Sequence, residues 1–258
     1  MKNKPFVTVL SGYGLNCEQE TLYAFKQAGA EGQIVHLNEL IENLRLISKS
    51  QIIAVPGGFS FGDDLGSGKA YGRKLDHHLG DALRTFLKRD TLMIGICNGF
   101  QILTQANLLP GALTYNTSNQ YIDRWVDLEV KSNSSPWLTG ITKISLPIAH
   151  GEGRYVADTK TFSALKKEDA IAFKYIDGEI CKEFNLPANP NGSTENIAGI
   201  TSHNGRVLGL MPHPERAIDF THLPHWTRLA DHAKRTGQSL KKEGSGLEIF
   251  KNAVKYFS

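Results

Sequence analysis

The most informative stretch of the sequence is Gly95-Ile96-Cys97-Asn98-Gly99-Phe100-Gln101-Ile102-Leu103. It follows the almost wholly apolar run Thr91–Ile96, which predicts a buried strand, and it continues into apolar residues at helical spacing. A glycine two positions before and two positions after a nucleophile is typical of a sharp strand-to-helix turn, where close neighbours must lack bulk. The stretch therefore predicts a nucleophile elbow with Cys97 at its apex.

The elbow would give Cys97 chemical advantages that a buried cysteine lacks. The turn lifts the thiol above the strand ends, where parallel sheets bind ligands. Unpaired N–H groups at the start of the helix stabilise a thiolate, and the Asn98 N–H would face a developing oxyanion. The alternative to a nucleophile, common for any cysteine, is a small buried hydrophobic residue with no chemical role. The flanking glycines favour the nucleophile at Cys97, whereas Cys17 and Cys181 have no such setting and are interpreted as structural.

Strand and helix signals alternate through the first hundred residues. Short apolar runs rich in β-formers are followed by segments with apolar residues at helical spacing, and Asn16 is a candidate helix cap. The predicted strands are 6–10, 33–37, 51–55 and 91–96, and the predicted helices begin after Asn16 and cover 39–47 and 75–88. Apolar strands alternating with helices indicate an α/β fold with a mostly parallel sheet that is buried on both faces.

The pattern changes from about Trp125 to shorter strands separated by turns. The runs Ile197–Ser202 and Arg206–Met211 flank His203-Asn204-Gly205, which is a hairpin signal and predicts an added antiparallel part of the sheet. The segment 223–246 is polar and irregular, and it is interpreted as a surface insertion of mixed helix and loop, whereas 247–257 is predicted as a closing amphipathic helix.

A cysteine nucleophile requires a histidine base, and a carboxylate should orient that base. Two of the nine histidines have a glutamate two positions later: His150 with Glu152, and His213 with Glu215. Prolines on either side of His213 would hold its ring in one place, whereas the glycines around the first pair suit a mobile loop. The second pair is preferred, but the residues alone leave both open.

Two glycine-rich segments offer main-chain N–H groups. Gly57-Gly58 follows the predicted strand 51–55, and the Gly58 N–H is the candidate for the second donor to the oxyanion. An ordinary tight turn is the alternative. The segment from Gly62 to Ala70 superficially resembles a phosphate loop, but the glycine spacing is one residue too long and Ala70 replaces the required Ser or Thr. Nucleotide binding is rejected there.

The composition narrows the functional classes. The chain has 258 residues with 40% hydrophobic and 21% charged residues, and a net charge of +3. The basic residues are scattered, unlike the basic stripe of a nucleic-acid binder, and no apolar run is long enough to span a bilayer. Three widely spaced cysteines argue against a disulfide framework and a zinc site. Without a signal-peptide pattern, we expect a soluble cytoplasmic protein.

Five motifs in chain order resemble the class I, or triad, glutamine amidotransferases, and more closely the glutaminase subunits of phosphoribosylformylglycinamidine synthase. The motifs are PGGFSFGD at 56–63, GICNGFQIL at 95–103, PIAHGEG at 147–153, NPNGS at 189–193 and MPHPER at 211–216. The resemblance covers nearly the whole chain. It implies one amidotransferase domain over 1–258 with a flavodoxin-like three-layer α/β/α sandwich, and a surface insertion at 219–246.

The resemblance also implies residue roles. Cys97, His213 and Glu215 would form the triad, with a glutamyl thioester on Cys97, and the N–H groups of Gly58 and Asn98 would bind the oxyanion. Glutamine would be bound by Gln101 and by Asn116, Thr117 and Ser118. The ammonia would pass to a synthetase subunit that binds ATP, magnesium and formylglycinamide ribonucleotide, usually with a third small subunit. No metal or cofactor is expected on this chain, and the segment 150–154 is interpreted as a contact with a partner or the pocket.

Two departures and two alternatives accompany the resemblance. Asn119-Gln120 and Asp123 stand where the family often has Leu-Lys and Cys, and 219–246 is longer than in compact members. The first alternative is a cysteine hydrolase or peptidase of the same superfamily, which often has histidine directly after the nucleophile, where this chain has Asn98. The second is a non-catalytic regulatory subunit. The presence of all three triad residues argues against it.

Overall fold

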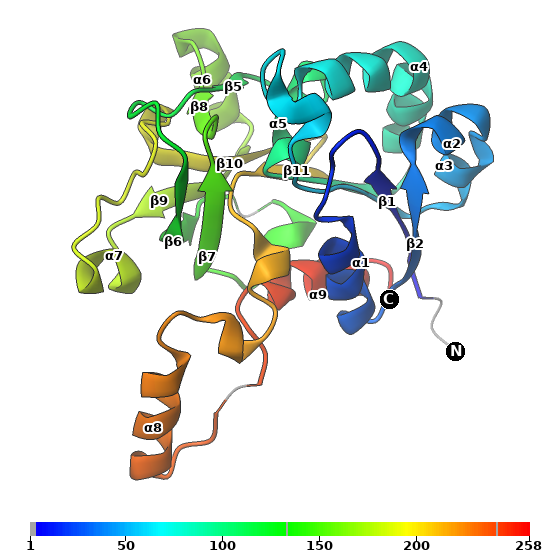
Figure 1. Cartoon of the computed structure of the whole chain (residues 1–258). Coiled ribbons are helices and arrows are strands. Elements are labelled where there is room, and N and C mark those ends of the chain that lie inside the picture. Colours follow the sequence, from blue (N-terminus) through cyan, green and yellow to red (C-terminus); the bar gives the residue numbers. More distant parts are fainter. Residues whose placement is uncertain (1–3, 133, 241) are drawn as a thin grey trace.

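The computed structural model describes residues 4–132, 134–240 and 242–258, which are built around a central nine-stranded sheet (Figure 1). The strand order is β2-β1-β3-β4-β11-β10-β9-β6-β7. The strands are β1 (Phe6–Ser11), β2 (Glu31–His36), β3 (Ile52–Val55), β4 (Leu92–Ile96), β6 (Ile122–Val130), β7 (Lys143–His150), β9 (Ile171–Ile176), β10 (Ile197–Ser202) and β11 (Val207–Leu210). A small second sheet pairs β5 (Ala112–Thr114) with β8 (Arg154–Val156).

The sheet has a parallel half and an antiparallel half, as the sequence predicts. The strands from β2 to β11 pair in parallel, and β10, β9, β6 and β7 pair antiparallel. All residues of β3, β4 and β11 are buried, because helices cover both faces of this region. The predicted α/β sandwich is therefore confirmed.

Helices of several lengths surround the sheet. They are α1 (Glu18–Gln27), α2 (Leu37–Glu42), α3 (Arg45–Lys49), α4 (Lys69–Lys88), α5 (Asn98–Gln105), α6 (Thr159–Lys167), α7 (Glu179–Glu183), α8 (Trp226–Thr236) and α9 (Leu247–Lys255). Short 3-10 turns are η1 (Ser60–Asp63), η2 (Pro136–Leu138), η3 (Thr194–Asn196), η4 (Pro214–Arg216) and η5 (Phe220–His222). Within the described ranges, none of the helices combines the length and apolar character needed to cross a bilayer.

Several predicted boundaries are wrong for local reasons. The single helix expected at 39–47 is two short helices, because Asn43 leaves helical geometry with φ −134° and ψ 82°. The helix expected from Leu75 begins at Lys69, after Gly68 in a left-handed conformation. The first helix is preceded by Cys17 as N-cap, and Asn16 does not cap it. The strands of the second half are not uniformly short as predicted, since β6 has nine residues and β7 has eight, whereas β8 has three and β11 four.

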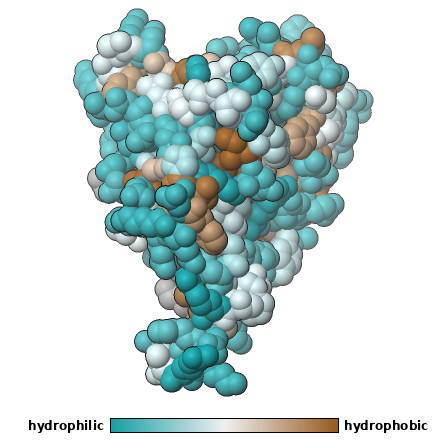
Figure 2. Space-filling view, turned by 60° about the vertical axis from the view of Figure 1, so that its left-hand side comes forward, coloured by the Kyte–Doolittle hydropathy of each residue, from teal (hydrophilic) through white to brown (hydrophobic). Residues whose placement is uncertain are grey.

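The segment 219–246 projects from the body of the molecule as an arm that carries α8 (Figure 1). Its two ends meet, because Phe220 N donates a 3.0 Å hydrogen bond to Lys242 O. Arg228 on α8 contacts Glu183 on α7 at 2.8 Å, which ties the arm to the helix that packs against β6. Figure 2 shows this arm as a narrow, mostly hydrophilic projection at the lower end of the molecule.

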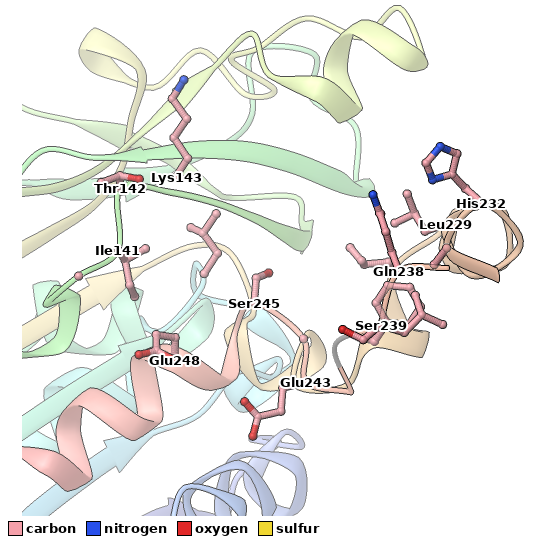
Figure 3. A pocket seen from close by; sticks show the side chains of 17 residues that line it. Ile141, Thr142, Lys143, Leu229, His232, Gln238, Ser239, Glu243, Ser245 and Glu248 are labelled. Atoms are coloured by element: carbon pink, nitrogen blue, oxygen red, sulfur yellow. The ribbon is translucent and has the colours of Figure 1, made fainter. Parts of the chain in front are cut away.

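Two hollows lie where the arm meets β7. One has a volume of about 580 Å³ and the other about 640 Å³. Figure 3 shows the first hollow, with Ile141 and Lys143 on the sheet side and Leu229 and His232 on the arm side. Neither is lined by the residues around Cys97, so the chemistry predicted from the sequence lies elsewhere.

Candidate active site

Cys97 stands between β4 and α5 with φ 51° and ψ −107°, a backbone conformation that L residues rarely adopt. The flanking glycines allow it. A Cβ on Gly99 would lie 1.9 Å from the Val55 carbonyl oxygen, and one on Gly95 would lie 2.6 Å from the Gly99 carbonyl oxygen. Larger residues at either position would force the turn open, so the spacing in the sequence has the steric cause predicted for a nucleophile elbow.

His213 and Glu215 form the buried pair that a cysteine nucleophile requires. Nδ1 of His213 is 2.6 Å from Oε1 of Glu215, and both side chains are almost completely buried. The main chain of His213 is also fixed, because its N–H donates a 2.8 Å hydrogen bond to the Pro147 carbonyl oxygen. Burial disfavours the imidazolium, but the charges of Glu215 and Cys97 outweigh it and raise the pKa of His213 well above its ordinary value.

Cys97 and His213 both line a cavity of only about 20 Å³. That volume holds roughly one water molecule. Nε2 of His213 has no hydrogen-bond partner in the described chain, and the Cys97 thiol donates to the Ala149 carbonyl oxygen at 3.7 Å. The cavity is lined by Asn16, Cys17, Gly58, Phe59, Cys97, Tyr121, Ala149, His213 and Arg216.

The two predicted oxyanion donors are available. Gly58 lines the cavity with φ 152°, and a Cβ there would lie 2.6 Å from the Gly14 carbonyl oxygen. Asn98 is the first residue of α5, where the N–H has no partner within the helix. Neither N–H donates to an acceptor among residues 4–132, 134–240 and 242–258. Both can therefore bind an anion that forms beside Cys97.

The side chains of Asn98 and Gln101 connect the elbow to neighbouring loops. Asn98 Nδ2 donates a 2.8 Å hydrogen bond to Gln101 Oε1, and Asn98 Oδ1 accepts one from the Ser60 N–H at 3.1 Å. Gln101 Nε2 donates a 2.7 Å bond to the Glu152 carbonyl oxygen. Gln101, predicted to bind glutamine, thus lies beside the elbow but does not line the small cavity.

The structure places the other predicted glutamine ligands less favourably. Asn116 is buried, and its amide oxygen accepts from the Gly153 N–H while its nitrogen donates to the His150 carbonyl oxygen. Its hydrogen-bonding capacity is used within the protein. Thr117 and Ser118 are exposed and do not line the cavity at Cys97.

His150, the rival base, has a different environment from that expected. It is the last residue of β7 and 2% exposed, not part of a mobile loop. Its Nδ1 lies 3.1 Å from Asn116 Oδ1, and Glu152 instead accepts from the Ser67 N–H. Burial lowers the pKa of His150 to about 4, so the ring is neutral at neutral pH. The carboxylate contact favours His213 as the base.

Cys17 and Arg216 are the residues that sequence reasoning missed. Cys17, interpreted as purely structural, lines the cavity, and Arg216 Nη2 is 2.9 Å from its sulfur. Cys17 Sγ, a His213 ring nitrogen and a Glu215 carboxylate oxygen all lie within 4.8 Å of one another. The order of the strands is the signal that could have placed Cys17 at the site. Cys17 follows β1, and Gly57 follows β3, which lies next to β1 in the sheet.

Comparisons with known proteins identify the family of the chain. The model of the CobB/CobQ-like glutamine amidotransferase domain matches residues 4–257. Phosphoribosylformylglycinamidine synthase subunit PurQ of Methanococcus maripaludis strain C7 is 44% identical over 100% of this chain and 99% of its own. The same subunit from Dehalococcoides mccartyi is 39% identical over 96% of each chain.

A solved structure extends the likeness to three dimensions. A chain in the structure of PurLQS from Thermotoga maritima is 32% identical, with a TM-score of 0.74 over 99% of this chain and 100% of that one. The likeness in sequence and in fold therefore covers almost the full length of both chains. This chain belongs to the CobB/CobQ-like glutamine amidotransferase family and, within it, to the PurQ subunits of phosphoribosylformylglycinamidine synthase.

Proposed function

We propose that the chain hydrolyses glutamine to glutamate and ammonia through a thioester on Cys97. The ammonia is delivered to a synthetase subunit that uses ATP to convert formylglycinamide ribonucleotide to formylglycinamidine ribonucleotide in purine biosynthesis. The observation that carries this proposal is the buried His213–Glu215 pair, 2.6 Å apart, with His213 in the lining of the same cavity as Cys97. Nε2 of His213 has no hydrogen-bond partner among the described residues, and Cys97 has the strained backbone of a nucleophile elbow.

The geometry supports a two-stage reaction. The Cys97 thiolate attacks the side-chain amide carbon, and the N–H groups of Gly58 and Asn98 bind the resulting oxyanion. His213 donates its proton to the leaving nitrogen as the C–N bond breaks, which releases ammonia and leaves the thioester. His213 then takes a proton from water, which attacks the thioester and releases glutamate, and the thiol is restored.

Glutamine enters the site only if the cavity enlarges. A space of about 20 Å³ has no room for a glutamine side chain. Phe59 and Tyr121 line this space, are 46% and 53% exposed, and have ring centroids 6.2 Å apart. Displacement of these two rings opens the cavity with little loss of buried contact. Gln101 borders the enlarged pocket, and Asn116, Thr117 and Ser118 contribute to its far end after rearrangement.

The proposal includes the rest of the assembly. ATP and magnesium bind to the synthetase subunit, and a third small subunit joins the complex, which operates in the cytoplasm. The whole chain forms a single amidotransferase domain in which 219–246 is an insertion. The solved PurLQS structure from Thermotoga maritima, which contains a chain similar to this one, supports a complex with more than a PurQ chain.

A covalent label tests the function directly. A diazo-ketone analogue of glutamine is added to the chain, with and without the loaded synthetase, and the modified peptide is located by mass spectrometry. We expect one adduct on Cys97, suppressed by excess glutamine. Label that forms only with the loaded partner would mean that assembly opens the cavity. No label in either state, with Cys97 still accessible to a general alkylating reagent, would refute the proposal and favour a non-catalytic subunit.

A further inference from the structure

We propose that Cys17, His213 and Glu215 form an inhibitory binding site for a thiophilic divalent cation such as Zn²⁺. The ligand atoms, one from each residue, lie within 4.8 Å of one another. Thiolate sulfur, imidazole nitrogen and carboxylate oxygen are the donors that zinc prefers. The site shares two residues with the catalytic triad and uses the Nδ1 side of His213, where Glu215 lies.

An unused buried oxygen supports this site independently of the thiol. Oε1 of Glu215 contacts His213, whereas Oε2 has no hydrogen-bond partner among the described residues. The Glu215 side chain is 0% exposed, so bulk solvent does not reach this oxygen. A buried carboxylate oxygen without a donor is costly, and a cation is one group that satisfies it.

The ligand atoms have to shift by about 1 Å to hold a zinc ion. Zinc bonds of about 2.3 Å to sulfur and about 2.0–2.2 Å to nitrogen and oxygen put the ligand atoms roughly 3.5 Å apart. Separations of at most 4.8 Å therefore shorten by at most about 1.3 Å, and the 2.6 Å contact between His213 and Glu215 lengthens by about 0.9 Å. Arg216, which now contacts the Cys17 sulfur, must move away. Its side chain is 41% exposed and also contacts Glu20 at 3.4 Å, so it has solvent to move into.

Binding at this site would invert the tautomer of the base. In the metal-free pair Nδ1 of His213 carries a proton toward Glu215. A cation on Nδ1 displaces that proton and leaves the ring with a single proton, on Nε2, and the Cys17 thiol proton is released to solvent when the metal–sulfur bond forms. Nε2 then carries a proton and no longer accepts one from the Cys97 thiol or from water. Glutamine hydrolysis stops, whereas use of free ammonia by the synthetase continues.

Cobalt and zinc binding distinguish Cys17 from Cys97 as the thiol ligand. Co²⁺ is added to the full chain carrying Cys97→Ala, Cys17→Ser or Cys181→Ser, and the thiolate-to-cobalt charge-transfer band is recorded. Zn²⁺ affinity is measured on the same variants by competition with a chelating dye. Ser replaces Cys17 at a helix N-cap, where a hydroxyl is well tolerated, and Cys181 is a matched control because it is equally buried.

We expect the band and the Zn²⁺ affinity to persist in Cys97→Ala and Cys181→Ser. In Cys17→Ser the band should disappear and the affinity should fall roughly tenfold or more. Loss of the band in Cys97→Ala with retention in Cys17→Ser would overturn the proposal and assign the metal to the nucleophile. Absence of a band in every variant that retains its native circular dichroism would also overturn it.

The inhibitory consequence is measured in the assembled synthetase. Zn²⁺ should lower the glutamine-dependent rate but not the ammonia-dependent rate, and each Cys17→Ser rate is compared with its own metal-free value. This consequence rests on the proposed glutaminase function, whereas the binding measurement does not. Metal binding without glutaminase activity in the metal-free complex would therefore count against the function and leave the site intact.

Discussion

Nδ1 of His213 donates a 2.6 Å hydrogen bond to Oε1 of Glu215, and both residues are buried. A carboxylate only accepts hydrogen bonds, so this contact fixes the tautomer and leaves the Nε2 lone pair for the Cys97 thiol. The pair sits where the chain leaves β11, next to β4, which ends just before Cys97. Base and nucleophile thus meet because two adjacent parallel strands end at the same edge of the sheet.

Replacement of Glu215 by Gln should lower the glutaminase kcat by about 10² to 10⁴-fold, because a Gln amide in contact with Nδ1 favours the wrong tautomer. The ammonia-dependent rate of the assembled synthetase should not change. Steady-state rates with each nitrogen source test this prediction, and Glu183→Gln, on α7 and outside the cavity lining, is the matched control. A glutaminase rate within a factor of about two of the wild type would remove Glu215 from the mechanism.

The Cys97→Ala variant should release no glutamate above background, since no thioester forms without the sulfur. It should still support synthesis from ammonia, because Ala is smaller than Cys in a conformation that the flanking glycines already permit. Glutamate release by the purified variant decides the matter. Near-normal release would contradict the covalent route and would direct attention to Cys17, the other thiol on the cavity wall.

Gly58→Ala should reduce glutaminase kcat by about 10² to 10³-fold through loss of the oxyanion donor geometry. The added Cβ would lie 2.6 Å from the Gly14 carbonyl oxygen, and the φ of 152° disfavours any side chain. Gly140→Ala is the control, because Gly140 also has positive φ but no heavy atom within 4 Å of its Cβ position. Equal activity losses in both variants would mean that backbone strain, not the oxyanion contact, is responsible.

The sequence predicts the parts of the site that depend on backbone geometry. The glycines around Cys97 and the prolines around His213 impose local conformations, so the elbow and the base can be recognised from the residues alone. The contact between Cys17 and Arg216 joins residues 199 positions apart. No local pattern encodes such a contact, and it becomes apparent only when the order of β1, β3, β4 and β11 is known.

Loop chemistry is also poorly predicted by the sequence. The glycines of the His150–Gly153 stretch suggest mobility, but a Cβ on Gly153 would lie 2.2 Å from the His150 ring, so this glycine permits close packing. Asn116 holds the same turn through its side-chain amide. Glycine in a sequence therefore does not separate flexibility from tight packing, and three-dimensional neighbours decide between them.

His150 should make the fold sensitive to acid. Its pKa is lowered to about 4 by burial, so below the ordinary value of 6.5 the unfolded chain binds a proton that the folded chain does not. The stability contribution is complete above pH 6.5 and is lost as the pH falls toward 4, by about 3 kcal/mol. Urea unfolding of His150→Gln at pH 7 and pH 5 measures it.

In His150→Gln the difference in unfolding free energy between pH 7 and pH 5 should be smaller than in the unchanged chain. His77→Gln is the control, since His77 is exposed on α4. An unchanged difference in the His150 variant would mean that other groups dominate acid unfolding.

Removal of the arm tests whether 219–246 is an insertion. The Phe220–Lys242 backbone bond brings its two ends together, so residues 222–239 are replaceable by Gly-Gly without stretching the chain. The deletion removes Leu223 and Leu229, which line the adjoining hollows together with Ile144. Loss of this apolar surface costs about 1–2 kcal/mol, and we expect the melting temperature to fall by roughly 2–8 °C. Labelling of Cys97 should be unaffected, because the hollows share no lining residue with the cavity. An insoluble product, or loss of labelling, would show that the arm is part of the domain core. Retained labelling with a lower ammonia transfer rate in the complex would show that the arm contacts the partner subunit.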